Sequence, residues 1–338
     1  MRNTPHSGSV SHDGGRPRRP PFRRNDGSDQ RRMQGGRSRS ESERPRPPSA
    51  VRKAFEQLTP MHPDKRLILE TQPEEKIGRW IDLVTPIGRG QRCLVVSPPK
   101  SGKTTILKTV SRALTQNHPD VAQFVLLVDE RPEEVTDFER SVKARVISSS
   151  SDKTTENHVE RTRAALEEAM QCAVEGRHAV ILLDSITRLA RAFNLHIDSY
   201  SKTLSGGLGA MAMEEPRRFF GAARSIENGG SLTVVATALV DTGSRMDDVI
   251  FQEFKGTGNM ELVLSRDLAE KRMFPAIQIK ESGTRKEELL YPESEYRGLV
   301  SLRQILAGLS PDDAFRMMDK ILNEFPKNRD LLLKLSES

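Results

Sequence analysis

The sequence predicts an α/β protein built on a mostly parallel, twisted sheet with helices on both faces. Apolar, β-branched runs of five to eight residues alternate along the chain with amphipathic stretches, as expected for strands buried on both faces. One run, LVVS, leads through the loop PPKSG into a helical pattern at Lys103, the layout of a phosphate-binding loop. Two later runs end in acidic residues, Asp129–Glu130 and Asp184.

Charge divides the chain into a basic tail and a near-neutral body. Residues 1–50 hold 12 arginines, no lysine and five acidic residues, a net charge of +7, whereas the whole chain carries +6. This stretch is rich in Gly, Ser and Pro and too poor in apolar residues to offset its ordering entropy, so we expect it to be disordered. It is either a solubilising tail or an arm that neutralises nucleic-acid phosphates. Arginine is the phosphate-pairing cation, which favours the arm.

The cysteines and the apolar runs bound the cellular setting. Cys93 and Cys172, the two cysteines of the chain, fall in apolar or amphipathic segments, so we expect buried, reduced thiols and a cytoplasmic location. No apolar run approaches the roughly 20 residues of a membrane helix, and the N-terminus has no apolar core of a signal peptide. We therefore expect no membrane partner.

After the tail, residues 51–91 are expected to form a short folded connector, and residues 92–338 an α/β domain that ends in a helical segment. Strands are expected at 93–97, 124–129, 144–150, 179–184, 232–239, 260–265 and 274–279, with helices at 104–114, 157–173 and 186–194. The last 40 residues change to a purely helical pattern, in which Ser310 is a plausible N-cap.

The phosphate-binding loop lies within Val95–Ile106. Backbone N–H groups and the positive end of a helix would converge there on an anion. Lys103 would reach the β- and γ-phosphates of a nucleotide, and the Thr104 hydroxyl would ligate Mg²⁺. Ser97 stands where the pattern G-x-x-x-x-G-K-[ST] has its first glycine, so the match is imperfect, and turn chemistry alone can produce a Gly-Lys-Thr. The other residues expected to bind the nucleotide in this loop are Lys100, Ser101, Gly102 and Thr105.

The strand-end acids give the loop its chemical partners. In a parallel sheet the carboxyl ends of the strands face the ligand crevice. Asp184 fits the Walker B role of holding Mg²⁺, and Glu130 fits the general base that orients the attacking water. Acids also cap helices, and capping alone explains one acid. Two strand-end acids downstream of a Gly-Lys-Thr loop favour nucleotide hydrolysis.

Phosphoryl transfer also needs positive charge on the transferred group, often from an arginine of another subunit. The candidates are Arg266, Arg272 and Arg285, and the residues alone do not choose among them.

Two Gly-rich, polar loops complete the candidate sites. Residues 201–218 contain Lys202, and residues 241–245 end in Arg245. Glycine lets backbone approach a ligand closely, and both cations could contact phosphates. The alternative is that both loops are ordinary surface loops.

Long motifs make the chain resemble the Rho family of transcription termination factors. They are PPKSGKT, LLVDERPEEVTDFER, LLDSITRLARAFN, the run from RRFFGAARSIENGG to KGTGNMEL, and LAEKRMFPAI with SGTRKEELL. The resemblance extends from about Phe55 to about Leu290. The phosphate loop of this family also lacks the first glycine, which removes the objection raised by Ser97.

The resemblance implies a RecA-like P-loop ATPase that forms a homohexameric ring, uses ATP and Mg²⁺, moves along single-stranded RNA as a helicase and acts on the transcribing RNA polymerase. The residues that it implies for ATP are Glu130, Arg131, Arg272 and Arg285 in catalysis, Lys100, Lys103, Thr104 and Asp184 on the phosphates and Mg²⁺, and Phe274 on the adenine. Those that it implies for RNA in the ring pore are Lys202, Gly206, Gly207 and Arg245, with Arg188 linking the pore to the ATP site.

One departure and three alternatives stay open. Rho proteins normally carry an N-terminal OB-type domain that binds cytosine-rich RNA, and nothing in this sequence predicts that barrel. The chain could therefore be a Rho-like ring ATPase without a termination role. An F-type rotary ATPase subunit would lack the loops of Lys202 and Arg245. A non-enzymatic RNA-binding ring would not need Lys103, Glu130 and Arg285.

Overall fold

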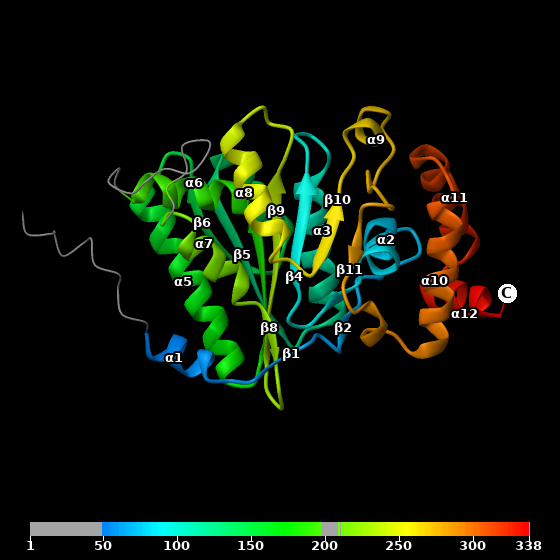
Figure 1. Cartoon of the computed structure of the whole chain (residues 1–338), viewed down its shortest axis with the longest axis horizontal. Helices are drawn as coiled ribbons and strands as arrows, with labels where there is room; N and C mark the ends of the chain where they lie inside the picture. Colours follow the sequence, from blue (N-terminus) through cyan, green and yellow to red (C-terminus); the bar gives the residue numbers. More distant parts are fainter. Residues whose placement is uncertain (1–48, 198–208, 210, 338) are drawn as a thin grey trace, which may run out of the picture. The chain divides into compact units, whose positions relative to one another are not determined.

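A nine-stranded sheet organises the part of the chain that this computed structural model describes, residues 49–197, 209 and 211–337. The main path runs β11-β10-β4-β9-β7-β5-β6; off this path, β8 pairs with β9, and β1 pairs with β8 (Figure 1). Every pair from β10 to β6 is parallel, whereas β11, β8 and β1 pair antiparallel. The predicted α/β class with a mostly parallel sheet is confirmed.

The strands are β1 Pro60–Met61, β2 Arg66–Leu67, β3 Ile87–Gly88, β4 Arg92–Ser97, β5 Val121–Glu130, β6 Arg145–Ser150, β7 His178–Asp184, β8 Arg224–Ile226, β9 Ser231–Leu239, β10 Met260–Val263 and β11 Gly283–Thr284. The helices are α1 Ala50–Glu56, α2 Lys76–Val84, α3 Lys103–Asn117, α4 Pro132–Ser141, α5 Thr155–Val174, α6 Ile186–His196, α7 Glu214–Gly221, α8 Arg245–Lys255, α9 Arg266–Glu270, the 3₁₀ helix η3 Glu287–Leu289, α10 Glu293–Ala307, α11 Pro311–Glu324 and α12 Asn328–Ser336. None of these helices is both long and apolar enough to cross a membrane.

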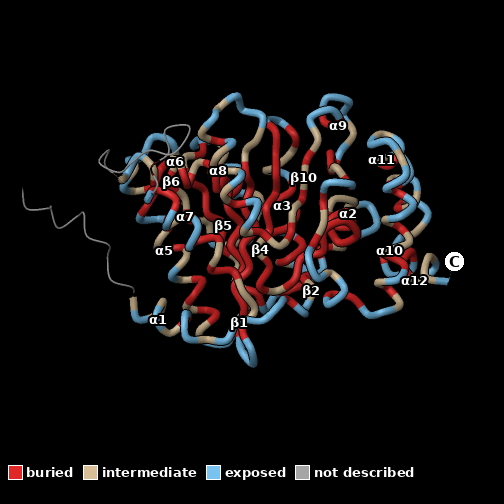
Figure 2. Tube along the Cα trace, viewed as in Figure 1, coloured by how far each residue is buried: buried red, intermediate tan, exposed pale blue. Residues whose placement is uncertain are grey.

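Side chains of the central strands alternate between two hydrophobic cores. In β4, Cys93 and Val95 join the core formed with α2, α3, α4 and the C-terminal helices. Leu94 and Val96 point to the other face, where they pack with residues of α1 and α5 to α8. Buried residues therefore run along the whole length of the central strands (Figure 2). Burial on both faces explains why these strands are almost entirely apolar.

Side-chain caps fix where several helices begin. The hydroxyl of Ser185 accepts a hydrogen bond from the backbone N–H of Arg188 at the start of α6. Ser310 accepts from the N–H of Asp313 at the start of α11, so this predicted N-cap is confirmed.

One predicted strand is wrong. Residues 274–279 form no strand, and only an isolated bridge joins Leu264 to Ile277. Pro275 has no N–H to donate to a ladder. The backbone of this segment instead contributes single bonds at the end of β10, such as the one from the N–H of Gln278 to the carbonyl of Val263, 2.8 Å. The short strand β11 pairs with the beginning of β10.

Arg79 ties the C-terminal helices to α2. Its guanidinium is fully buried and donates to the Leu322 carbonyl, 2.8 Å, to the Asn328 side chain, 3.1 Å, and to the Phe325 carbonyl. These acceptors lie at the end of α11 and the start of α12. A buried charge-assisted network of this kind is costly to leave incomplete.

We therefore expect Arg79→Met to destabilise the protein by roughly 2–4 kcal/mol, because it leaves several buried acceptors unpaired while conserving apolar volume. Urea unfolding measures the change. The matched control is Arg145→Met, since Arg145 makes an exposed ion pair with Glu168 and should cost less than about 1 kcal/mol. Equal effects of the two substitutions would contradict the role of Arg79.

Candidate functional site

The loop between β4 and α3 has the backbone of an anion-binding turn. Gly102 is the N-cap of α3 with φ 102°, a left-handed conformation, and so it supplies no side chain to cap the helix. The first helical bond of α3 runs from the N–H of Ile106 to the Gly102 carbonyl, 3.1 Å. The N–H groups of Lys103, Thr104 and Thr105 therefore have no acceptor within the helix, and the positive helix end faces the same point.

Two serine hydroxyls hold this loop from inside. Ser97 and Ser101 are buried, and their hydroxyl oxygens are 2.8 Å apart. Ser101 also donates to the Pro98 carbonyl, 2.8 Å. Ser97, at the position of the missing glycine, thus stabilises the turn, and the side chain of Ser101 serves the loop rather than facing the open side.

Lys103 lies between two carboxylates at the ends of neighbouring strands. Its Nζ donates to both carboxylate oxygens of Asp184 at 2.7 Å and lies 3.3 Å from Oε1 of Glu130. Burial by itself would lower the pKa of Lys103, but the carboxylates of Asp184 and Glu130 outweigh it and raise that pKa above its ordinary value. Lys103 therefore remains a cation here.

The surroundings of Glu130 oppose its ionisation. It is 2% exposed, and burial, reinforced by the charge of Asp184, raises its pKa to about 7 against the opposing effects of Lys103 and Arg188. Asp184 is 1% exposed and accepts a hydrogen bond from the Thr237 hydroxyl at 2.8 Å. Thr237 was not predicted from the sequence. Because β9 also contains Ser231 and Thr233, the sequence of the strand does not single out Thr237.

Arg188 joins the ends of β5 and α6. Its Nη1 donates to the Asp129 carbonyl, 2.7 Å, and to the Asp129 carboxylate, 3.1 Å. Its Nε lies 3.2 Å from Oε1 of Glu130, an ion pair without hydrogen-bond alignment. Asp129 has φ 56°, an uncommon conformation for a residue with a side chain. Arg188 therefore fixes the backbone that carries Glu130.

The remaining residues predicted for the nucleotide lie around this cluster. Thr104 is half-buried, whereas Lys100, Thr105 and Arg131 are exposed. Phe274 is 46% exposed, and a Cβ placed on Gly102 would lie 4.0 Å from its ring. The loop and Phe274 thus flank one open area.

Arg285 does not join this cluster. It follows β11, whose Thr284 pairs with Met260 at the start of β10, and Met260 pairs with Cys93 at the start of β4. The phosphate loop follows the other end of β4, so the sheet separates Arg285 from Lys103 within one chain.

Arg272 lies with Phe274 on the chain after α9, and its side chain is exposed. Neither Arg272 nor Arg285 makes an ion pair or side-chain hydrogen bond within the described residues. Both guanidinium groups are therefore available to another molecule.

The two polar loops are described only in part. Arg245 is exposed at the start of α8, after the strand β9 that adjoins β7, so it lies at the same edge of the sheet as Asp184. The preceding turn is held by the Thr242 hydroxyl, which donates to Asp247 at 2.6 Å. Lys202, Gly206 and Gly207 lie outside the described residues.

The donor set fits a nucleotide with Mg²⁺. Uncapped N–H groups and Lys103 suit phosphate oxygens. A threonine hydroxyl and an aspartate carboxylate are the hard oxygen ligands that Mg²⁺ takes alongside phosphate.

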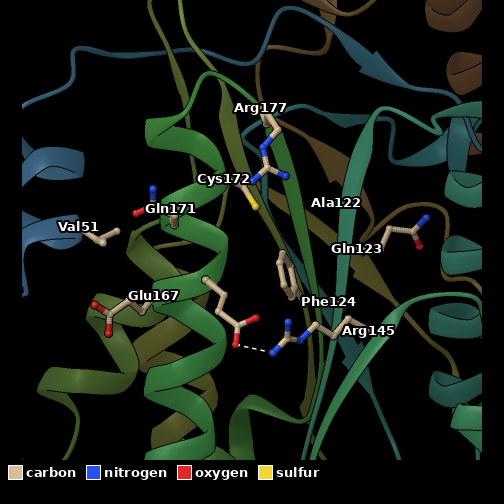
Figure 3. Close-up of a pocket in the computed structure, with 10 residues that line it drawn as sticks. Val51, Ala122, Gln123, Phe124, Arg145, Glu167, Gln171, Cys172 and Arg177 are labelled. Carbon is tan, nitrogen blue, oxygen red and sulfur yellow. Dashed lines mark hydrogen bonds and ion pairs between the residues drawn. The ribbon is translucent and has the colours of Figure 1, made fainter.

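A hollow of about 630 Å³ lies elsewhere, between α1, α5 and the strands β5 and β6 (Figure 3). Val51, Phe124 and Cys172 contribute to its lining. Two of its charged groups, Arg145 and Glu168, form an ion pair with each other, 2.8 Å apart along the dashed line. No residue of the phosphate loop lines it, so the chemistry lies in the strand-end cluster and not in this hollow.

Comparison with known proteins agrees with this geometry. The chain is 55% identical over 267 residues to transcription termination factor Rho of Bacillus subtilis, a match that covers 79% of this chain and 62% of that protein. It is 50% identical over 284 residues to Rho of Micrococcus luteus, covering 84% of this chain and 41% of that protein. The predicted resemblance to Rho is confirmed, and the chain spans about half the length of these curated relatives.

Solved structures show the same fold at low identity. An ATPase of a bacterial type III secretion system superposes with a TM-score of 0.69 at 22% identity, covering 82% of this chain and 87% of that one. The assembled ATPase EscN of enteropathogenic E. coli gives a TM-score of 0.66 at 21% identity, covering 82% and 73%. Residues 78–284, which contain the whole strand-end cluster, match the nucleotide-binding domain of the ATP synthase alpha/beta family. The chain belongs to this family.

Proposed function

We propose that the chain is an RNA-dependent ATPase of the Rho type. Hydrolysis of ATP at the subunit interfaces of a homohexameric ring would drive movement along single-stranded RNA, in transcription termination at the RNA polymerase elongation complex. The observation that carries the proposal is the junction of Lys103, Asp184 and Glu130 beside an uncapped helix end, in a chain 50–55% identical to curated Rho proteins.

Within one subunit, each group has a separate task. The N–H groups at the start of α3 and Lys103 bind the phosphates, with Lys100 at the mouth of the loop and the adenine on Phe274. Thr104 and Asp184 hold Mg²⁺, which neutralises charge on the phosphates when bound. Because Lys103 lies within 3.3 Å of Glu130, the phosphate bound to Lys103 would lie close to that carboxylate. Glu130 would then orient water and accept its proton.

Arginines outside the cluster of Lys103, Asp184 and Glu130 would supply further positive charge to the transferred phosphoryl group. Arg285 is exposed on the opposite edge of the sheet, so it serves the nucleotide of a neighbouring subunit, as in other ring ATPases that use an arginine in trans. We assign a second interfacial contact to Arg272. Arg131, next to Glu130, belongs to the site of its own subunit.

RNA would contact the loops at the same edge as the ATP site. Lys202, Gly206 and Gly207 would form one pore loop, and Arg245 would lie in the second. Arg188 contacts Asp129 and Glu130 from α6 and would relay a shift of that helix to the general base. The predicted cytoplasmic location fits a protein with this role.

Lys103→Ala and Glu130→Gln should separate binding from chemistry. We expect the alanine variant to lose nucleotide affinity, because it removes the cation that faces the phosphates. The glutamine variant should bind ATP with near-normal affinity and hydrolyse it about 10²–10⁴-fold more slowly, since it cannot accept a proton. A fluorescent ATP analogue and phosphate release in the presence of RNA measure the two effects. Near-normal turnover in Glu130→Gln would contradict the general-base assignment.

Arg285→Ala should keep the fold and ATP binding and lose roughly 10³–10⁵-fold in turnover, the effect of removing an arginine supplied in trans. Mixing this variant with an excess of Lys103→Ala should restore part of the activity, because the second variant offers intact arginines to intact phosphate loops. The assignment fails if subunits exchange and no mixing ratio recovers activity.

The arginine-rich tail should bind RNA phosphates without base preference. Deleting residues 1–50 removes 12 arginines and should weaken RNA binding most strongly at low salt. The slope of log K against log salt should flatten by about 0.7 for each phosphate no longer neutralised. Titration of labelled RNA at several salt concentrations checks this. An unchanged affinity and slope would show that the tail only solubilises the protein.

A further inference from the structure

Asn259 links Arg285, whose side chain would reach into a neighbouring subunit, to β4, the strand that leads to the phosphate loop. It immediately precedes β10. Its backbone carbonyl accepts the N–H of Arg285 at 2.9 Å, which extends the β10–β11 ladder by one residue. The point from which the Arg285 side chain departs is therefore set by the position of Asn259.

Asn259 is in turn fixed by the start of β4. Its N–H donates to the Arg92 carbonyl at 3.1 Å, and its side-chain Oδ1 accepts the N–H of Arg92 at 2.8 Å. A backbone N–H can only donate, so the atom that faces it must be the amide oxygen. The side chain of Asn259 thus replaces a strand partner for β4 beyond the end of the parallel ladder.

Gln91 completes the network from a buried position. It is 1% exposed, and its Nε2 donates to the carbonyl of Asn259 at 3.0 Å and to Oδ1 at 2.9 Å. The Gln91 carbonyl accepts the N–H of Val234 in β9, 3.0 Å. The support of Asn259 is therefore anchored in the central sheet.

The segment that carries Arg285 is held on its other side as well. The Thr284 hydroxyl donates to the Pro86 carbonyl at 2.8 Å. Beyond this anchored backbone the guanidinium of Arg285 is exposed and has no acidic partner within the described residues. The side chain of Arg92 donates to the carbonyls of Thr257 and Ala223. Burial lowers the pKa of Arg92, and the positive charges of Arg224 and Arg285 lower that pKa further. An anchored backbone and an unpaired guanidinium suit a side chain that must reach another molecule in a defined direction.

We propose that Asn259, held by Gln91, is the positioning residue for Arg285 in catalysis at the neighbouring subunit's nucleotide. This inference rests on the proposed function, in which Arg285 acts in trans. The strand β4 begins at this network and ends at the phosphate loop, roughly 20 Å away for six residues. One strand of each subunit thus carries both the loop for its own nucleotide and the support of the arginine for the next.

The test compares Asn259→Ala with Arg285→Ala in the full-length protein with RNA present. We expect Asn259→Ala to lower kcat by about 10–10²-fold, since a misplacement of about 1 Å costs that much. KM for ATP and the affinity for a fluorescent ATP analogue should stay unchanged, because the subunit's own loop is intact. An excess of Lys103→Ala subunits should restore part of the lost activity.

A double-mutant cycle gives the sharpest readout. In the Arg285→Ala background, adding Asn259→Ala should change turnover by less than twofold, because the group that it positions is already absent. Gln91→Met should reproduce the loss of kcat and its recovery in mixtures to a smaller extent, and it replaces Asn259→Ala should that variant fail to fold. The matched control is Asn117→Ala, which removes two amide hydrogen bonds, to the carbonyls of Ile68 and Glu70, far from this network. It should leave kcat unchanged.

The outcomes that overturn the proposal are distinct from those that overturn the function. If Arg285→Ala loses turnover while Asn259→Ala keeps it within twofold, Asn259 does not position the arginine. The same follows if the two losses add in the double mutant, or if mixing rescues Arg285→Ala but not Asn259→Ala. If Arg285→Ala itself keeps normal turnover, Arg285 does not act on the nucleotide of the neighbouring subunit, and that part of the proposed function is wrong.

Discussion

Two buried carboxylates on neighbouring strand ends are the constraint on which the site depends. Asp184 and Glu130 are almost fully buried, and two such charges would repel each other and lose hydration. Lys103 compensates both with distances of 2.7 and 3.3 Å. This requires the first residue of α3 to meet the last residues of β5 and β7. A parallel sheet with its strands in this order brings those three points together, and only a sheet covered on both faces buries them.

The same sheet keeps Lys103 and Arg285 apart within one chain. In parallel strands all carboxyl ends lie at the same end of the sheet, so the loops after β4, β5, β7 and β9 converge there. The start of β4 and Arg285 lie at the opposite end of the strands. No rotation of a side chain closes that separation within one chain. A reaction that needs Lys103 and Arg285 together therefore requires two chains, and association becomes part of the chemistry.

Features of the fold and the site could be predicted from the sequence where they depend on neighbouring residues, but not where they depend on residues far apart in the chain. Continuous apolar runs correctly predicted six of the seven expected strands, and the acids at their ends located the cluster, because both signals are local. The run at 274–279 was wrongly predicted as a strand, since its apolar pattern outweighed the missing donor of Pro275. Thr237 and Asn259 could not be found, because each acts through a hydrogen bond to a residue more than 50 positions away, and no local pattern singles out either side chain.

Backbone conformation points to the same residues from an independent direction. A residue with a side chain adopts positive φ at a cost of about 1–3 kcal/mol, and such strain persists where the surrounding structure enforces it. Asn228 lies in the turn between β8 and β9, where asparagine tolerates this conformation. The other five such residues lie in the phosphate loop (Lys100), next to Glu130 (Asp129), in the loop before Arg245 (Asp241), and at or next to an exposed arginine (Arg272 and Lys286). Backbone strain is thus found in loops that carry polar or charged side chains. The two large hydrophobic cores on either side of the sheet offset its cost.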